Sequence, residues 1–227
     1  MKAKIYPSKC SGQIVIPPSK SMGHRAIICA SMAPGRSIIK NTAYSDDIKT
    51  TIEGMRKLGA VIEENGSTLI IDGIKDITKI SDETINCNES GSTLRFFIPI
   101  FSLTGKKITF LGKNRLLKRP QKIYEDIFKE QKLHYYHDES KMEIEGKLKA
   151  GTYEIDGNIS SQFISGLLFT LPLLEGDSEI KIRPPFESAS YIDLTLEMLK
   201  RFGIEIFQKD ELTFNRYAFV FGSGYKR

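Results

Sequence analysis

The sequence contains an internal repeat, and this repeat constrains the fold more than any other feature of the chain. Three segments align with one another: SGQIVIPPSKSMGHRAIICASMAPG, ETINCNESGSTLRFFIPIFSLTG and GTYEIDGNISSQFISGLLFTLPLLEG. Each shows a short strand, a loop rich in Ser, Thr or Gly, an apolar helix and a closing glycine, and the closing glycines Gly35, Gly105 and Gly176 are about 70 residues apart. One supersecondary unit is therefore expected to occur three times.

The stretches that follow the closing glycines also match one another. Each begins with a strand pattern and a polar loop, continues as an amphipathic helix and ends as a two-stranded hairpin. Apolar residues recur at helical spacing in residues 48–58 and 192–202, and Gly59 and Gly203 follow where a left-handed helix end is typical. The middle copy has Lys132 at this point, so a less sharply defined helix end is expected there.

The pattern as a whole predicts three pseudo-symmetric βαβαββ units in an α/β (α+β) fold. The first helix of each unit is apolar nearly all round and is expected at the centre, whereas the second is amphipathic and is expected nearer to solvent. Strands should then wrap the central parallel helices. Because a repeat that returns the chain to the same orientation also aligns its helices, all six helix N-termini should open at one end of the domain.

Charge and cysteine content limit the partners and the compartment. The net charge is +5, but 33 basic and 28 acidic residues are interspersed, which favours a local anion site over a nucleic-acid tract. Cys10, Cys29 and Cys87 lack CxxC spacing, so neither disulfides nor a zinc site are expected. The apolar runs at 96–103 and 166–174 are shorter than the ~18 residues of a membrane span, and no secretory signal is evident, so we expect a cytoplasmic protein.

Basic side chains recur at the predicted helix starts, where their charge is unfavourable. Lys20 and Arg25 lie at or just inside the first helix, Arg95 lies in the first turn after SGST, and Arg119 directly precedes Pro120. A cation at a helix N-terminus opposes the macrodipole by about 0.3 to 1 kcal/mol. A bound phosphate or carboxylate would satisfy helix amides, hydroxyls and these cations together. The sequence therefore predicts a site for a phosphorylated or carboxylated small molecule, with a set of merely exposed basic side chains as the alternative.

The other polar residues at these helix starts have a simpler interpretation. Ser, Thr, Asp and Asn side chains accept hydrogen bonds from free helix amides and stabilise a helix by about 1 kcal/mol. Capping is accordingly the role expected of Asp46 and Asp47, with acid/base chemistry as the alternative.

The helix-start motifs resemble, in the same order, those of the N-terminal half of the 3-phosphoshikimate 1-carboxyvinyltransferase (5-enolpyruvylshikimate-3-phosphate synthase) family. The motifs are PPSKSMGHRA, ESGSTLRF, RLLKRP, GNISSQF and ESASYIDLTL. The resemblance implies that Lys20 contacts substrate and is the candidate for proton chemistry or charge neutralisation. It implies these further contacts: Ser21 and Arg25 with substrate; Gly91 and Ser92 beside the pyruvyl pocket, supported by Arg95; Arg119 with phosphoenolpyruvate; Ser160, Ser161 and Gln162 with shikimate 3-phosphate; Ser188 with its phosphate; and Tyr191 beside its ring.

Members of this family transfer the enolpyruvyl group of phosphoenolpyruvate to the 5-hydroxyl of shikimate 3-phosphate, a step of the shikimate pathway to aromatic amino acids. The resemblance implies the family's inside-out barrel of strands around helices, no metal or organic cofactor, and a monomer. It places residues 1–13 in a strand that belongs with a second domain, residues 14–222 in a three-repeat substrate-binding domain, and residues 223–227 at the start of a crossover to the second domain. Because that domain supplies acid/base groups, we expect this chain to be an isolated N-terminal domain that is inactive alone.

Two other functions are compatible with parts of the pattern. A related enolpyruvyl transferase that acts on a UDP-sugar shares the fold, but its Lys-Asn entrance motif and its cysteine before Arg119 are absent. A non-enzymatic nucleic-acid-binding module would use the positive charge, but the loops lack interleaved aromatic and basic residues. His134 and His137 lie on a predicted hairpin strand without further metal ligands nearby in the sequence, so no metal site is expected.

Overall fold

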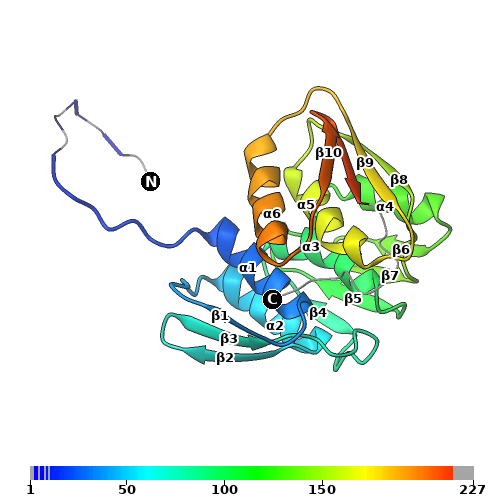
Figure 1. The fold of residues 1–227 in the computed structure, drawn as a ribbon, viewed down its shortest axis with the longest axis horizontal. Coiled ribbons are helices and arrows are strands. Elements are labelled where there is room, and N and C mark those ends of the chain that lie inside the picture. The colour runs from blue at the N-terminus through cyan, green and yellow to red at the C-terminus, as the bar shows by residue number, and fades with distance from the viewer. Residues whose placement is uncertain (1–2, 5, 8, 10, 217–227) are drawn as a thin grey trace.

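Three successive groups of helices and strands follow the three repeats of the sequence (Figure 1). The computed structural model describes residues 3–4, 6–7, 9 and 11–216. The predicted crossover at residues 223–227, the predicted domain end at residue 222 and parts of the predicted strand at residues 1–13 lie outside the described residues.

The second and third groups have the predicted βαβαββ order. The first group contains α1 (Lys20–Met32), β1 (Arg36–Ile39), α2 (Asp46–Leu58), β2 (Val61–Asn65) and β3 (Thr68–Asp72). The second contains β4 (Thr84–Asn86), α3 (Gly91–Ser102), β5 (Ile108–Leu111), α4 (Lys122–Glu130), β6 (His134–His137) and β7 (Lys141–Glu145). The third contains β8 (Thr152–Asp156), α5 (Ser161–Thr170), the short 3-10 helix η1 (Leu171–Leu173), β9 (Ser178–Arg183), α6 (Ala189–Arg201), β10 (Phe207–Asp210) and β11 (Thr213–Arg216).

Each group forms its own sheet. The second sheet has the strand order β4-β5-β7-β6 and the third β8-β9-β11-β10, and in both the first two strands are parallel and the other pairs antiparallel. The first sheet has the order β1-β3-β2, with antiparallel pairs throughout. The prediction of a leading strand in the first repeat is therefore wrong, because residues 11–19 form no strand.

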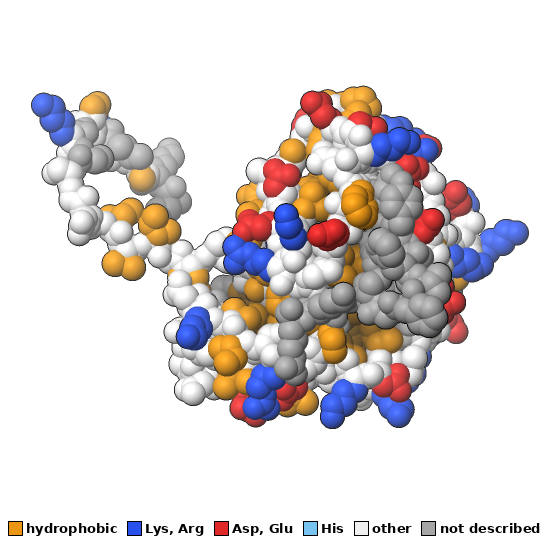
Figure 2. All heavy atoms as spheres, in the orientation of Figure 1, with side chains coloured by type: hydrophobic (Ala, Val, Ile, Leu, Met, Phe, Trp, Pro, Cys, Tyr) orange, Lys and Arg blue, Asp and Glu red, His pale blue; other side chains and the backbone are white. Residues whose placement is uncertain are grey.

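Residues 11–19, which precede α1, run away from the rest of the structure as an extended arm (Figure 1), and apolar side chains along them are open to solvent (Figure 2). Ile14, Val15 and Ile16 are 87%, 98% and 78% exposed. The residue two positions before the helix cap gives a local reason why this segment does not turn back toward the sheet. In the second repeat Asn88 takes φ 47° there as the chain turns from β4 into α3, whereas Pro17 at the matching position cannot adopt a positive φ.

The three amphipathic helices end in more similar backbone conformations than the sequence predicts. Gly59 and Gly203 adopt left-handed conformations with φ 113° and 77°, as predicted from their position after α2 and α6. Lys132 after α4 also adopts this conformation, with φ 56°. The middle repeat therefore makes a left-handed helix end with a residue that has a side chain, despite the absence of glycine.

The central position predicted for the apolar helices is confirmed for α3 and α5, whose residues are nearly all buried. The three sheets lie around them (Figure 1). The two helices approach each other closely at Gly166, where an added Cβ would lie 2.6 Å from the Arg95 carbonyl oxygen of α3 and 2.5 Å from the Tyr124 hydroxyl of α4. This close crossing brings the starts of α3 and α5 together.

Candidate functional site

Contacts between helix starts show that all six meet at one end, as predicted. Lys20 of α1 pairs with Asp47 of α2, and hydroxyl groups join α2 to α3. Side chains of α3 also contact the starts of α4 and α5, and a side chain of α1 contacts the start of α6. The five sequence motifs therefore occupy a single surface.

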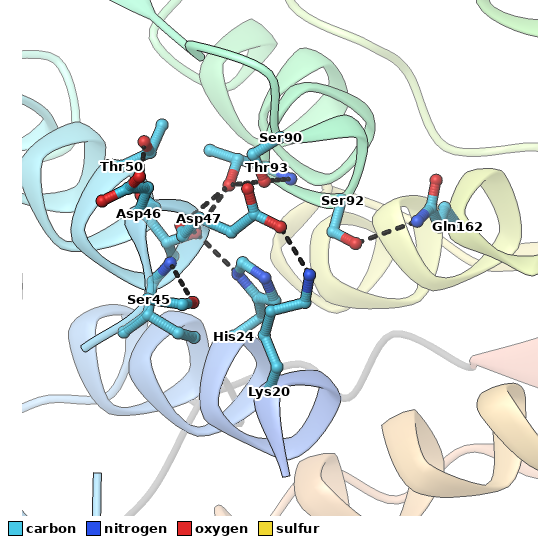
Figure 3. A network of polar contacts seen from close by, with 12 residues as sticks. Lys20, His24, Ser45, Asp46, Asp47, Thr50, Ser90, Ser92, Thr93 and Gln162 are labelled. Carbon is cyan, nitrogen blue, oxygen red and sulfur yellow. Dashed lines mark hydrogen bonds and ion pairs between the residues drawn. The ribbon is translucent and has the colours of Figure 1, made fainter. Parts of the chain in front are cut away.

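The two neighbouring acids at the start of α2 have different surroundings. The cap of this helix is Ser45, whose hydroxyl accepts from the backbone N–H of Ile48 at 3.4 Å. Asp47 accepts from the Lys20 ammonium, with 2.6 Å between Oδ2 and Nζ (Figure 3). The prediction that Asp46 and Asp47 cap the helix is therefore wrong, because Ser45, the residue directly before the helix, takes that role and both acids lie in the first turn.

Arg25 is buried rather than displayed at the surface, with only 3% of its area exposed. Its Nε donates to the Thr195 hydroxyl at 2.7 Å, and Nη1 donates to the Ser21 carbonyl at 2.9 Å. Nη2 donates to the Ser165 hydroxyl at 3.2 Å and to the Tyr191 carbonyl at 2.9 Å. Burial lowers the pKa of Arg25 to about 10, so the guanidinium stays charged at neutral pH. Four of its five N–H donors are thus used, three to join α1 to α5 and α6 and one within α1, and one N–H of Nη1 remains.

Arg95 holds together the starts of three helices. Its Nη1 donates to Gln162 Oε1 at 2.8 Å, its Nη2 donates to the Pro120 carbonyl at 3.3 Å, and its guanidinium lies 4.5 Å from the centre of the Phe163 ring. The other end of the Gln162 amide donates to the Ser92 hydroxyl at 2.9 Å (Figure 3). The orientation of the Gln162 amide is therefore fixed from both ends.

Arg119 lies against the first residue of α3. An added Cβ on Gly91 would be 2.7 Å from Nη1 of Arg119 and 3.8 Å from Gln162 Oε1. The absence of a side chain at Gly91 therefore lets the Arg119 guanidinium approach the N-terminus of α3. Burial, and to a smaller extent the positive charge of Arg119, lowers the pKa of Arg95.

Ser160, Ser161, Ser188 and Tyr191, which were predicted as ligands, lie at the starts of α5 and α6, and of the two serines that directly precede these helices only Ser160 caps its helix. Ser160 caps α5 by accepting from the backbone N–H of Gln162 at 3.4 Å, which leaves its own O–H able to donate. Ser161 is 7% exposed at the first position of α5. Ser188 precedes α6 with φ 59°, a left-handed conformation unusual for serine, and its side chain makes no capping bond. Tyr191 is half exposed in the first turn of the same helix.

A buried chain of side chains lies close to Lys20, and the sequence interpretation did not identify it. His24 Nδ1 is 2.8 Å from the Thr51 hydroxyl, which is 2.7 Å from the Thr93 hydroxyl, which in turn is 2.7 Å from the Ser90 hydroxyl. Burial lowers the pKa of His24 to about 4, with Lys20 and Arg25 also lowering it and Asp47 raising it. The imidazole is therefore neutral at physiological pH.

The charges at this end suit an anion. The guanidinium groups of Arg25, Arg95 and Arg119 make no ion pair with a carboxylate within residues 11–216, and the groups that accept hydrogen bonds from Arg25 and Arg95 there are neutral oxygens. Helix N-termini add partial positive charge and free N–H groups. Several charge-assisted hydrogen bonds of about 1.5 to 3 kcal/mol each would hold a multiply charged small molecule here.

The part of the chain that the structure describes shows neither a metal-binding cluster nor a membrane-spanning helix. In it, His, Cys, Asp and Glu side chains form no group of three or more that could hold a metal ion. Its helices include none that is both long and apolar enough to cross a membrane.

Comparisons with known proteins agree with this arrangement of motifs. The sequence model of the family described as EPSP synthase (3-phosphoshikimate 1-carboxyvinyltransferase) matches residues 5–216. A 3-phosphoshikimate 1-carboxyvinyltransferase of Clostridium perfringens (strain SM101 / Type A) is 52% identical over 207 residues, which make up 90% of this chain and 49% of that protein. The protein of the same name from Clostridium kluyveri is 48% identical over 202 residues, covering 88% and 47%.

A solved structure of EPSP synthase from Acinetobacter baumannii has the same fold, with a TM-score of 0.74 at 21% identity over 90% of this chain and 46% of that chain. The α/β fold class predicted from the repeats is thereby confirmed. The chain spans about half the length of the curated relatives it matches. These matches do not favour the alternatives of a UDP-sugar enolpyruvyl transferase or a nucleic-acid-binding module.

Proposed function

Because the chain belongs to the EPSP synthase family, we propose that it forms the N-terminal substrate-binding domain of a 3-phosphoshikimate 1-carboxyvinyltransferase. In this reaction the enolpyruvyl group of phosphoenolpyruvate passes to the 5-hydroxyl of shikimate 3-phosphate and inorganic phosphate is released. The observation that carries the proposal is the convergence of Arg25, Arg95 and Arg119 at helix N-termini without carboxylate partners among the described residues. Both substrates carry a phosphate and a carboxylate, which are the groups that such an end attracts.

We assign shikimate 3-phosphate to the side formed by α5 and α6. The Gln162 amide is oriented by Arg95 and Ser92, so it presents a defined donor and acceptor to a ligand. Ser160 and Ser161 are at the start of the same helix. Across from them, α6 supplies Ser188 and Tyr191, and α1 supplies Ser21 together with the remaining N–H of Arg25. The strained φ of Ser188 supports a ligand role, because unusual backbone conformations are concentrated at functional sites.

Phosphoenolpyruvate belongs, in this proposal, between Lys20, Gly91, Ser92 and Arg119. Lys20 is next to Ser21 in the sequence, so we assign its ammonium to shikimate 3-phosphate as well. Transfer requires a proton on the methylene carbon of phosphoenolpyruvate, loss of the proton of the attacking 5-hydroxyl, and departure of phosphate from the resulting tetrahedral carbon with loss of a methyl proton. Lys20 and Arg119 would stabilise the negative charge on the phosphate and carboxylate during these steps. Lys20 is also the candidate for moving one of the protons, because its amine is exposed at the rim.

The extended arm supports a second domain as the partner of this one. Ile14 precedes the cap Ser19 by five residues, as Ile85 precedes Ser90 and Ile155 precedes Ser160, and the latter two isoleucines are buried in leading strands. We propose that residues 1–13 and the exposed Ile14 and Ile16 pair with a strand of the second domain, that residues 14–222 form the substrate-binding domain and that the chain crosses over at 223–227. We further propose that the whole enzyme is a monomer in the cytoplasm and uses no metal or organic cofactor.

The chain alone is expected to bind shikimate 3-phosphate but not to turn it over. The described residues at the site are mostly basic or neutral, and Asp47 is already paired with Lys20, so acid/base groups for two proton transfers have to come from elsewhere. Calorimetric titration with shikimate 3-phosphate measures binding, and phosphate release from the two substrates measures turnover. Absence of binding would contradict the proposed site, and turnover at ordinary enzymatic rates would contradict the need for a second domain.

Replacing Gln162 with alanine is expected to weaken shikimate 3-phosphate binding about tenfold, because one oriented amide is lost and Nη1 of Arg95 loses its acceptor. The matched control is Gln131→Ala, since Gln131 contacts Tyr153 and Lys149 at the far end of α4. Calorimetry on both variants gives the comparison. Equal dissociation constants for the two variants would remove Gln162 from the site.

A further inference from the structure

The ion pair between Lys20 and Asp47 joins the first residue of α1 to the second residue of α2. The side chain of Lys20 is 55% exposed and that of Asp47 is 28% exposed. An exposed pair of this kind usually contributes little, because both side chains have to be ordered to make it. Here the backbone of Asp47 is fixed, so its carboxylate can hold the Lys20 ammonium in one position.

Two buried hydroxyls hold the backbone of Asp47. The carbonyl of Asp47 accepts from the Thr51 hydroxyl at 3.3 Å and lies 3.5 Å from the Thr93 hydroxyl. Thr51, Thr93 and Ser90 are at most 1% exposed, and the chain of hydroxyls runs from α2 to the cap of α3. The position of Asp47 is therefore tied to α3, whose start carries the proposed ligands Gly91 and Ser92.

The same chain ties α2 to α1 one turn below Lys20. His24 follows Lys20 by four residues, so the two share a helix face, and Thr51 follows Asp47 by the same interval. Lys20 pairs with Asp47 at the surface (Figure 3), and His24 pairs with Thr51 in the interior. The lowered pKa of His24 keeps this interior pair uncharged, so no buried cation competes with Lys20 for the carboxylate.

From this arrangement we infer that Asp47 is a positioning residue that holds the Lys20 ammonium at the mouth of the substrate site. The inference rests on the proposed function. A lysine side chain has four rotatable bonds, and ordering a free one on binding a ligand reduces affinity. An ammonium has three N–H donors, so one can stay on Asp47 while others donate to an anionic ligand. Asp47 thereby acts on the substrate through Lys20 and not by contact.

The neighbouring acid supplies a matched control. Asp46 has the same charge in the same first turn of α2, but its side chain makes no ion pair with Lys20 in the described structure. Asp46→Asn and Asp47→Asn therefore remove the same charge and the same interaction with the helix dipole. Only Asp47→Asn removes the carboxylate that holds Lys20.

The test is a double-mutant cycle on the binding of shikimate 3-phosphate, measured by calorimetry. Asp47→Asn is expected to weaken binding about fivefold and Asp46→Asn to change it less than about twofold. In a Lys20→Met background Asp47→Asn should no longer weaken binding, because the residue through which it acts is gone. Thermal unfolding of the two Asn variants should be alike.

Three results would overturn the inference while leaving the proposed function intact. Equal weakening by Asp47→Asn with and without Lys20 would mean that Asp47 supports the structure in general. Tighter binding by Asp47→Asn in the wild-type background would mean that Asp47 competes with the ligand for Lys20. Equal effects of Asp46→Asn and Asp47→Asn on binding would mean that Asp47 acts only through its contribution to the net charge. Failure of the wild-type protein to bind shikimate 3-phosphate would overturn the proposed function and the inference with it.

Discussion

Gly166→Ala is expected to lower the free energy of unfolding by about 3 kcal/mol, because α3 and α5 cross at this residue without room for a methyl group. The added Cβ would lie 2.6 Å from the carbonyl oxygen of Arg95 and 2.5 Å from the Tyr124 hydroxyl, both of which are inside normal contact distances. One of these neighbours is backbone, which cannot rotate away. The helices would have to separate, and the Arg95 to Gln162 hydrogen bond would lengthen with them.

Urea denaturation measures this loss, and Gly23→Ala in α1 is the control. At Gly23 the added Cβ would meet only the flexible end of Ile48 at 3.0 Å, and alanine is favoured over glycine in a helix by about 1 kcal/mol. Gly23→Ala is therefore expected to be close to neutral. Adding Tyr124→Phe to Gly166→Ala should recover only part of the stability, since the contact with the Arg95 carbonyl remains. Full recovery would show that the backbone crossing is looser than its distances indicate.

The order of elements was predictable because it depends on patterns within short stretches of sequence. Apolar spacing in residues 48–58 and 192–202 is a local property, and it correctly predicts α2 and α6. The closing glycines Gly35, Gly105 and Gly176 all take positive φ values, as their place in the repeat requires. The leading strand of the first repeat was the exception, because a strand forms only where another strand pairs with it, and β1 has no such partner among residues 11–19.

The positions of the site residues were less predictable than their identities. The motifs indicate which side chains gather at the helix starts, but the burial of Arg25 depends on α5 and α6, which lie more than a hundred residues further along the chain. The pairing of Asp47 with Lys20 likewise depends on how α1 packs against α2. One signal was available, since Lys20 and His24, and Asp47 and Thr51, are each four residues apart and complementary in hydrogen bonding.

Stability is expected to fall by about 2 kcal/mol between pH 7.5 and pH 5 through His24 alone. The unfolded imidazole takes up a proton near its ordinary pKa of 6.5, whereas burial holds the folded pKa to about 4. Between these values the unfolded state binds more protons, so acidification favours unfolding. Above pH 6.5 both states are neutral and the contribution is fully present, and it is lost as the pH falls toward 4.

The protein has three histidines, so the contribution of His24 can be isolated by substitution. Urea unfolding at pH 7.5, 6 and 5 should show a flatter pH dependence for His24→Asn than for the wild type, although its stability at pH 7.5 is lower because the contact with Thr51 changes. His134→Asn, at an exposed position on β6, should keep the wild-type slope. The Asp47 carboxylate opposes the shift by raising the pKa of His24, so Asp47→Asn should steepen the dependence slightly. An unchanged slope in His24→Asn would show that other groups cause the acid sensitivity and that the hydroxyl chain at α1, α2 and α3 does not depend on a neutral imidazole.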